Sequence, residues 1–239
     1  MVSATRGEQN LSFHYKLSFN DGKALAFCIE IDRDTGNFIP PPLEAPPFWS
    51  ALEYRQCENC PLSSHHTAYC PVAVNLIPLI ELCGPLVSYE DVSLEVATRE
   101  RTVRGDTSLQ RALSSMLGLI MATSPCPHTE YLKPMAQFHL PLASPEETVY
   151  RTSSMFLLAQ YFLHKDGLEA TLELDKLTDI YQNLQTINRA LTRRFKAAIS
   201  EDATINAIVL LDLLSQSVAW SIEDGLEHLR YLFRRYGVK

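Results

Sequence analysis

The chain has 239 residues, of which 46% are hydrophobic and 21% are charged. This composition is typical of a soluble globular protein and argues against disorder over most of the length. The formal net charge of −7 gives no overall electrostatic reason to bind nucleic acid, because counterion release requires a surplus of Lys and Arg facing the phosphates.

The first ten residues, MVSATRGEQN, contain no apolar stretch that could serve as a signal peptide. No segment approaches the run of about 20 consecutive apolar residues that a membrane span needs. We therefore expect a cytoplasmic protein with no membrane partner. In a reducing compartment, six cysteines are interpreted as free thiols, metal ligands or catalytic groups rather than as disulfides.

Two antiparallel strand pairs are predicted in the first part of the chain. Apolar and polar residues alternate over residues 11–31, with Asp21-Gly22 between the two runs, and they alternate again over residues 91–106. Asp-Gly favours a type I′ turn, whose two central residues need positive φ. Cys28 has the opposite parity from the apolar residues beside it, so we expect it on the other face of the hairpin.

The helical period begins after the second strand pair. Helices are expected over residues 71–84, 108–124, 144–164 and 172–199, with one or two more over residues 201–235. Ser144, Pro145 and Glu147 form a capping-box signature at the start of one of them. The predicted fold class is α+β: about four strands with a cysteine-rich loop and a short helix in residues 1–105, then an all-helical bundle in residues 106–239.

The cysteine-rich loop carries the strongest chemical signal. Cys57 and Cys60 form a C-x2-C pair, and Cys70 follows after nine residues. A four-ligand centre needs one more group, and the best candidate is Cys126, which proline follows as it does Cys60 and Cys70. The alternative is that all four are buried thiols acting as small hydrophobic residues. We favour ligation, because a loop rich in polar residues and proline is poor core material.

Two metal centres fit a four-cysteine site. Zinc is the usual occupant of a structural site of this kind, whereas cysteine followed by proline also recurs at the ligands of a [4Fe-4S] cluster. The two are nearly equally favoured, with the cluster slightly ahead. His65 and His66 could replace a thiolate on zinc, although an exposed loop position is the favoured interpretation. Cys83 is expected about 20 Å from Cys70 along a helix, too far for the same site.

A resemblance supports this site. The Asp-Gly hairpin and the segments CENCPL, YCPVAVNL, RALSSMLGLIMATSPCPHT and PMAQFHLPLASPEET resemble, in this order and along nearly the whole chain, a bacterial protein family of unknown function. The resemblance implies that the family's four-cysteine pattern is present at Cys57, Cys60, Cys70 and Cys126. It implies no activity.

Other candidate residues have simpler interpretations. Cys126 with His128 could form a thiolate nucleophile and its base, but no oxyanion hole or phosphate loop accompanies them. His139 is expected to be partly buried and hydrogen-bonded. Asp212 interrupts an apolar helix, and a buried carboxylate needs a partner. The candidate partners are arginines of the preceding helix: Arg189, Arg193 and Arg194.

The favoured function is a cytoplasmic interaction or regulatory protein in which a four-cysteine centre is mainly structural; whether the protein is an enzyme is left open, and a non-enzymatic role is preferred. The alternative is an iron-sulfur redox enzyme or a metal-dependent enzyme. Nucleic-acid binding comes third, because the basic runs 189–196 and 230–239 are better explained as solvated helix ends. The sequence is compatible with a protein partner but identifies none, and no small-molecule substrate can be named.

Overall fold

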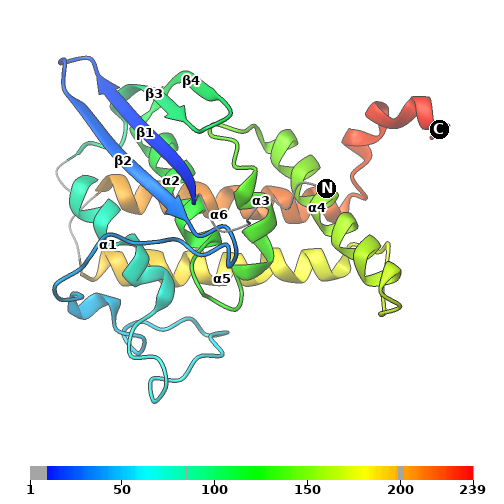
Figure 1. Ribbon diagram of the computed structural model, residues 1–239, viewed down its shortest axis with the longest axis horizontal. Coiled ribbons are helices and arrows are strands. Elements are labelled where there is room, and N and C mark those ends of the chain that lie inside the picture. The colour runs from blue at the N-terminus through cyan, green and yellow to red at the C-terminus, as the bar shows by residue number, and fades with distance from the viewer. Residues whose placement is uncertain (1–9, 84–85, 199–201, 239) are drawn as a thin grey trace, which may run out of the picture.

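The computed structural model describes residues 10–83, 86–198 and 202–238. Four strands and a series of helices make up this part of the chain, so the predicted α+β class is confirmed (Figure 1). The elements are, in order, β1 (Leu11–Phe19), β2 (Ala24–Ile31), η1 (Phe48–Ser50), α1 (Pro71–Cys83), β3 (Asp91–Ala97), β4 (Thr102–Ser108), α2 (Leu109–Ala122), η2 (Glu130–Leu132), α3 (Lys133–Gln137), α4 (Pro145–Lys165), α5 (Asp175–Lys196), α6 (Asp202–Glu223) and η3 (Glu227–Tyr236).

The strands form one antiparallel sheet in the order β2-β1-β3-β4. β1 lies inside the sheet, where Tyr15 pairs with Phe27 on one side and with Val96 on the other. The apolar residues that alternate along β1 are buried: Phe13, Tyr15, Leu17 and Phe19. The alternation in the sequence therefore identified the face of the sheet that covers the helices.

The turn between β1 and β2 differs from the prediction. Gly22 has a φ of 87°, whereas Asp21 does not have the positive φ that a type I′ turn requires of both central residues. The Gly22 N–H donates to the Phe19 carbonyl at 3.1 Å, and the Phe19 N–H donates to the Lys23 carbonyl at 2.9 Å. A three-residue loop that ends in a left-handed glycine thus replaces the expected two-residue turn. Cys28 is exposed, as expected.

The two long helices α5 and α6 lie side by side beneath the sheet and α2 (Figure 1). The apolar stripe of α5 faces the interior, since Leu177, Leu184, Ile187, Leu191 and Phe195 are buried. One connected hydrophobic core includes residues of both the sheet and the helical part. β4 runs into α2 at Ser108, and a domain boundary between residues 105 and 106 stays a prediction.

α6 combines length with low polarity. Within the described residues it is the one helix long and apolar enough to cross a membrane by length and composition. Core helices of soluble proteins meet the same criterion, and α6 packs against α2, α4 and α5. Only 33% of its apolar window is buried, so these contacts explain part of its apolar character.

The N-terminus of α4 carries the predicted capping box. Ser144 Oγ accepts from the Glu147 N–H at 3.1 Å, and Glu147 Oε2 accepts from the Ser144 N–H at 2.7 Å. We expect Ser144→Ala to lower the free energy of unfolding by about 1 kcal/mol, because it leaves a helix N–H without its acceptor. Urea denaturation measures this change. The control is Ser154→Ala at an exposed position of the same helix, and an equal loss in both variants would contradict the assignment.

Candidate metal centre

The cysteine-rich loop lies between η1 and α1 and is held by backbone hydrogen bonds. The Cys60 N–H donates to the Cys57 carbonyl at 3.1 Å, which closes the C-x2-C segment into a turn. The Cys70 N–H donates to the Ser50 carbonyl at 2.8 Å, immediately before α1 begins. These bonds bring both ends of the loop together, so its three thiols are close in space despite the residues between them.

Cys126 joins this group from the other part of the chain. It follows the end of α2, and together with Cys57, Cys60 and Cys70 it lines one small cavity of about 20 Å³. Two of the other lining residues are polar, His128 and Arg194. The rest are apolar: Leu52, Leu62, Pro71, Val72, Ile187, Ala190 and Leu191. The structure thus brings together all four predicted ligand residues.

The other predicted candidates lie elsewhere. Cys28 is exposed on the sheet and Cys83 is buried near the end of α1, and neither lines the cysteine cavity. His65 and His66 are exposed loop residues outside it, which was the favoured interpretation of both. All six cysteines are free thiols. Within the described residues, no three or more His, Cys, Asp or Glu side chains are arranged so that they could hold a metal ion. The four thiols therefore line one cavity but do not form such a metal-binding group.

Burial sets the acid-base properties of these thiols. It raises the pKa of Cys57 to about 12, and the neighbouring Cys70, Cys60 and Cys126 add to this effect because adjacent thiolates repel one another. Burial also raises the pKa of Cys126. Hydrogen bonds from the backbone N–H groups of His128 and Thr129 lower this pKa, but burial has the larger effect. Without a cation, Cys57 and Cys126 are therefore protonated at neutral pH.

Arg194 is the residue of this site that sequence reasoning missed. Its side chain was expected on a solvated helix end or beside Asp212, but it is only 2% exposed and lines the cysteine cavity. The guanidinium donates to three carbonyl oxygens of the segment before the loop: those of Trp49 at 2.5 Å, Ala51 at 2.7 Å and Leu52 at 3.3 Å. Neighbouring Arg193 is exposed, as predicted.

Arg194 also introduces a positive charge beside the thiols. Burial lowers the pKa of its guanidinium, whereas Cys70 and Cys57 act in the opposite direction. A cation in this position stabilises any negative charge that the sulfurs acquire. The local sequence gives no signal of this role, because Arg194 follows another arginine on a helix with many polar residues.

Side chains fasten the cysteine loop to its surroundings. His128 Nε2 lies 2.7 Å from the Asn59 carbonyl oxygen, to which it must donate, and Asn59 Nδ2 donates to Asn183 Oδ1 on α5 at 2.8 Å. An exposed ion pair between Arg193 and Glu58, at 3.3 Å, adds a weaker connection. The loop thus contacts both α5 and the segment after α2.

Two further predictions are confirmed outside this site. Asp212 Oδ2 lies 3.8 Å from Arg189 Nε and accepts from Gln216 Nε2 at 2.8 Å, so this oxygen is paired, whereas the buried Oδ1 has no hydrogen-bond partner among the described residues. His139 is half-buried and hydrogen-bonded to Tyr15 and Ser115. Both residues have structural explanations of the kind expected.

The fold and the site together define an α+β protein in which four cysteines from two distant segments line one cavity. The chain belongs to the family described as a domain of unknown function, DUF6901, whose model matches residues 13–234. This confirms the predicted membership of a family of unknown function; the cysteine pattern stays a prediction. No curated protein and no solved structure matches the chain.

Proposed function

We propose that Cys57, Cys60, Cys70 and Cys126 bind one [4Fe-4S] cluster, and that the cluster mainly stabilises the fold of an interaction or regulatory protein. The observation that carries the proposal is that a thiol from beyond α2 lines the same cavity as the three loop thiols. Hydrophobic packing also brings distant residues together, and Cys57, Cys70 and Cys126 pack against the core, but four thiols at one cavity supply a complete ligand set.

The sequence, rather than the shape of the site, favours the cluster over zinc, because proline directly follows Cys60, Cys70 and Cys126. Four thiolates on one zinc ion lie about 2.3 Å from a common point, so their sulfurs are about 3.5 to 4 Å apart with no space between them. The cavity of about 20 Å³ is close to the size of one water molecule, and among the described residues no side-chain group is arranged to hold a metal ion. A [4Fe-4S] cluster needs sulfurs about 6 to 7 Å apart, so the sulfur–sulfur distances in the metal-loaded protein distinguish the two centres.

The surroundings suit a negatively charged centre. Arg194 lies beside the thiols with a buried guanidinium, and backbone N–H groups of His128 and Thr129 hydrogen-bond to the Cys126 sulfur. Hydrogen bonds to ligand sulfurs and nearby charge are the means by which proteins tune iron-sulfur centres. A bound cluster would supply iron-thiolate bonds and, where a partner can reach it, one-electron transfer.

A structural role follows from what the cysteines connect. The segments carrying Cys70 and Cys126 are 56 residues apart, and a metal centre between them closes a long loop of the chain. The cysteine-rich loop between η1 and α1 has little secondary structure of its own, so metal-ligand bonds would contribute much of its order. An iron-sulfur redox enzyme is the second candidate, since the four cysteines are only half-buried and electrons could reach the centre.

The test is anaerobic purification of the full chain followed by iron, sulfide and zinc analysis. We expect about four iron and four sulfide per chain, with a brown colour and an absorption shoulder near roughly 400 nm. A colourless protein with one zinc per chain would show that the four-cysteine site holds zinc and not a cluster. Protein with neither metal, after iron and sulfide are supplied under reducing conditions, would contradict the site. Reversible bleaching by dithionite would favour the redox role.

A further inference from the structure

A second cavity, of about 530 Å³, lies in the helical part of the molecule. Side chains from α2, α4, α5 and α6 and from the segment around α3 line it, and it shares no lining residue with the cysteine cavity. Its volume falls within the range of about 300 to 1,000 Å³ that is usual for small-molecule sites. Arg111 and Leu213 line it and are exposed, so the cavity reaches the surface and a ligand can enter.

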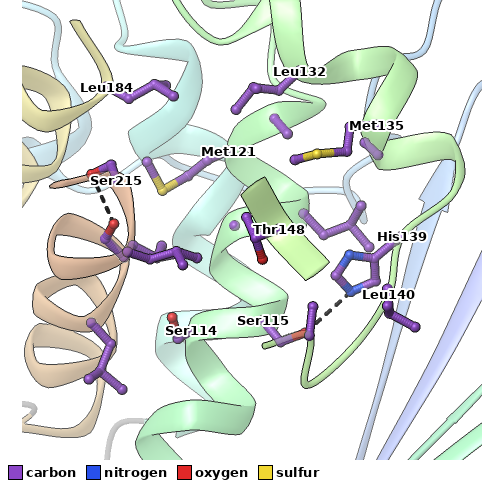
Figure 2. Close-up of a pocket in the computed structure, with 18 of the residues that line it drawn as sticks. Ser114, Ser115, Met121, Leu132, Met135, His139, Leu140, Thr148, Leu184 and Ser215 are labelled. Carbon is purple, nitrogen blue, oxygen red and sulfur yellow. Dashed lines mark hydrogen bonds between the residues drawn. The ribbon is translucent and has the colours of Figure 1, made fainter. Parts of the chain in front are cut away.

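The walls of the large cavity are mainly aliphatic. Figure 2 shows Met121, Met135, Leu132, Leu140 and Leu184 around the space, with side chains from separate elements facing one another. More leucines come from α2, α6 and the segment before α4: Leu119, Leu142, Leu210, Leu211, Leu213 and Leu214. Such walls offer water few hydrogen-bond partners. The transfer of a hydrocarbon group from water into this space is therefore favourable. The two methionines can adapt to irregular ligand shapes.

Polar groups gather near His139. The His139 Nε2 atom lies 2.5 Å from the Tyr15 hydroxyl and 3.2 Å from Ser115 Oγ, and the second of these contacts is drawn in Figure 2. Burial, helped by the Arg151 guanidinium, lowers the pKa of His139 to about 3, so this ring is neutral at physiological pH. The imidazole therefore adds a polar group to the lining and no charge.

The charged lining residues are both arginines. Arg111 Nη2 donates to the Leu142 carbonyl at 3.3 Å, and Arg151 Nη2 donates to the Phe138 carbonyl at 2.7 Å. A guanidinium has five N–H donors, so these bonds leave donors for a ligand. Glu147 interacts electrostatically with Arg151, but no aspartate or glutamate is found among the described residues that line the cavity.

We propose that this cavity binds an aliphatic monocarboxylate. The hydrocarbon part lies among the leucines and methionines, and the carboxylate lies at Arg111 and Arg151 beside the neutral His139. A carboxylate accepts charge-assisted hydrogen bonds from guanidinium groups, which gives the ligand its orientation. The apolar walls would exclude a small hydrophilic acid from most of the space, and the arginines would favour an acid over an uncharged chain of equal length.

Calorimetric titration of the full-length protein with decanoate and with decanol tests the ligand class. We expect decanoate to bind more tightly than decanol. Arg111→Gln should weaken decanoate binding about tenfold and leave decanol binding unchanged, because it removes a charge-assisted contact and keeps the walls. The matched control is Arg33→Gln, an exposed arginine outside the cavity lining, which should change neither affinity.

A second variant tests the location. Leu214→Trp places a larger side chain in the lining and should abolish the binding of both probes, with folding checked by circular dichroism. Unchanged decanoate binding in a folded Leu214→Trp protein would overturn the proposal, as would no binding of either probe to the wild type. If Leu214→Trp does not fold, the comparison of Arg111→Gln with Arg33→Gln decides: equal affinities in those two variants would overturn the assignment of the carboxylate to Arg111.

Discussion

Replacement of Cys126 by Ser is expected to release the metal centre and to lower the free energy of unfolding by at least about 3 kcal/mol. Cys126 is the only proposed ligand from outside the loop, so without it the centre loses its fourth ligand and its connection to the segment after α2. The binding free energy of a structural metal is part of the folding free energy, and the long closed loop constrains the unfolded chain. Iron and sulfide content and anaerobic urea denaturation measure both effects.

Cys28→Ser is the matched control for this change. Cys28 is exposed on β2 and does not line the cavity, so the variant should keep its metal and its stability. Cys83→Ser should also keep its metal, although it places a hydroxyl in a buried position and so costs some stability. Full metal content in Cys126→Ser would show that the three loop cysteines suffice, and it would contradict a shared four-cysteine centre.

Replacement of Arg194 by Met is expected to lower the free energy of unfolding by about 3 kcal/mol or more. The methionine fills much of the same volume, but the Trp49, Ala51 and Leu52 carbonyl oxygens lose their donor, and each buried unsatisfied group costs about 1 to 3 kcal/mol. The metal centre should also become more labile, because the cation beside Cys57 and Cys70 is gone. Urea denaturation and the rate of metal loss to a chelator measure the two results.

Arg193→Met provides the comparison on the same helix. The ion pair of Arg193 with Glu58 is exposed on both sides, and such pairs contribute at most about 1 kcal/mol. Equal losses of stability in the two variants would show that the buried guanidinium of Arg194 does not hold the loop. A normal rate of metal loss in Arg194→Met, with stability reduced, would limit its role to the carbonyl hydrogen bonds.

Features set by neighbouring residues were predictable from the sequence. The alternation in β1, the apolar stripe of α5 and the capping box of Ser144 and Glu147 all depend on residues within a few positions of one another. The β1–β2 turn was only partly predictable, because Asp-Gly is compatible with more than one loop length. There the pairing of Phe19 with Lys23 left three residues in the loop.

Features that join distant segments were decided by the tertiary structure. The spacing of Cys57 and Cys60 indicates a site, and the need for a fourth ligand suggested Cys126, but only packing places that cysteine at the same cavity. Nothing in the local sequence distinguishes buried Arg194 from exposed Arg193. The difference in burial arises because the two side chains lie at different positions around α5 relative to the cysteine loop.

The large cavity is the clearest example of a feature that could not be predicted from the sequence. Its leucines and methionines have the spacing of ordinary core residues, and the space between them depends on how α2, α4 and α6 come together. In this protein the sequence by itself determined the elements, their buried faces and a set of candidate ligands. The tertiary structure decided which thiols share a cavity, which arginine is buried and where space remains, because each depends on contacts between residues far apart in the chain.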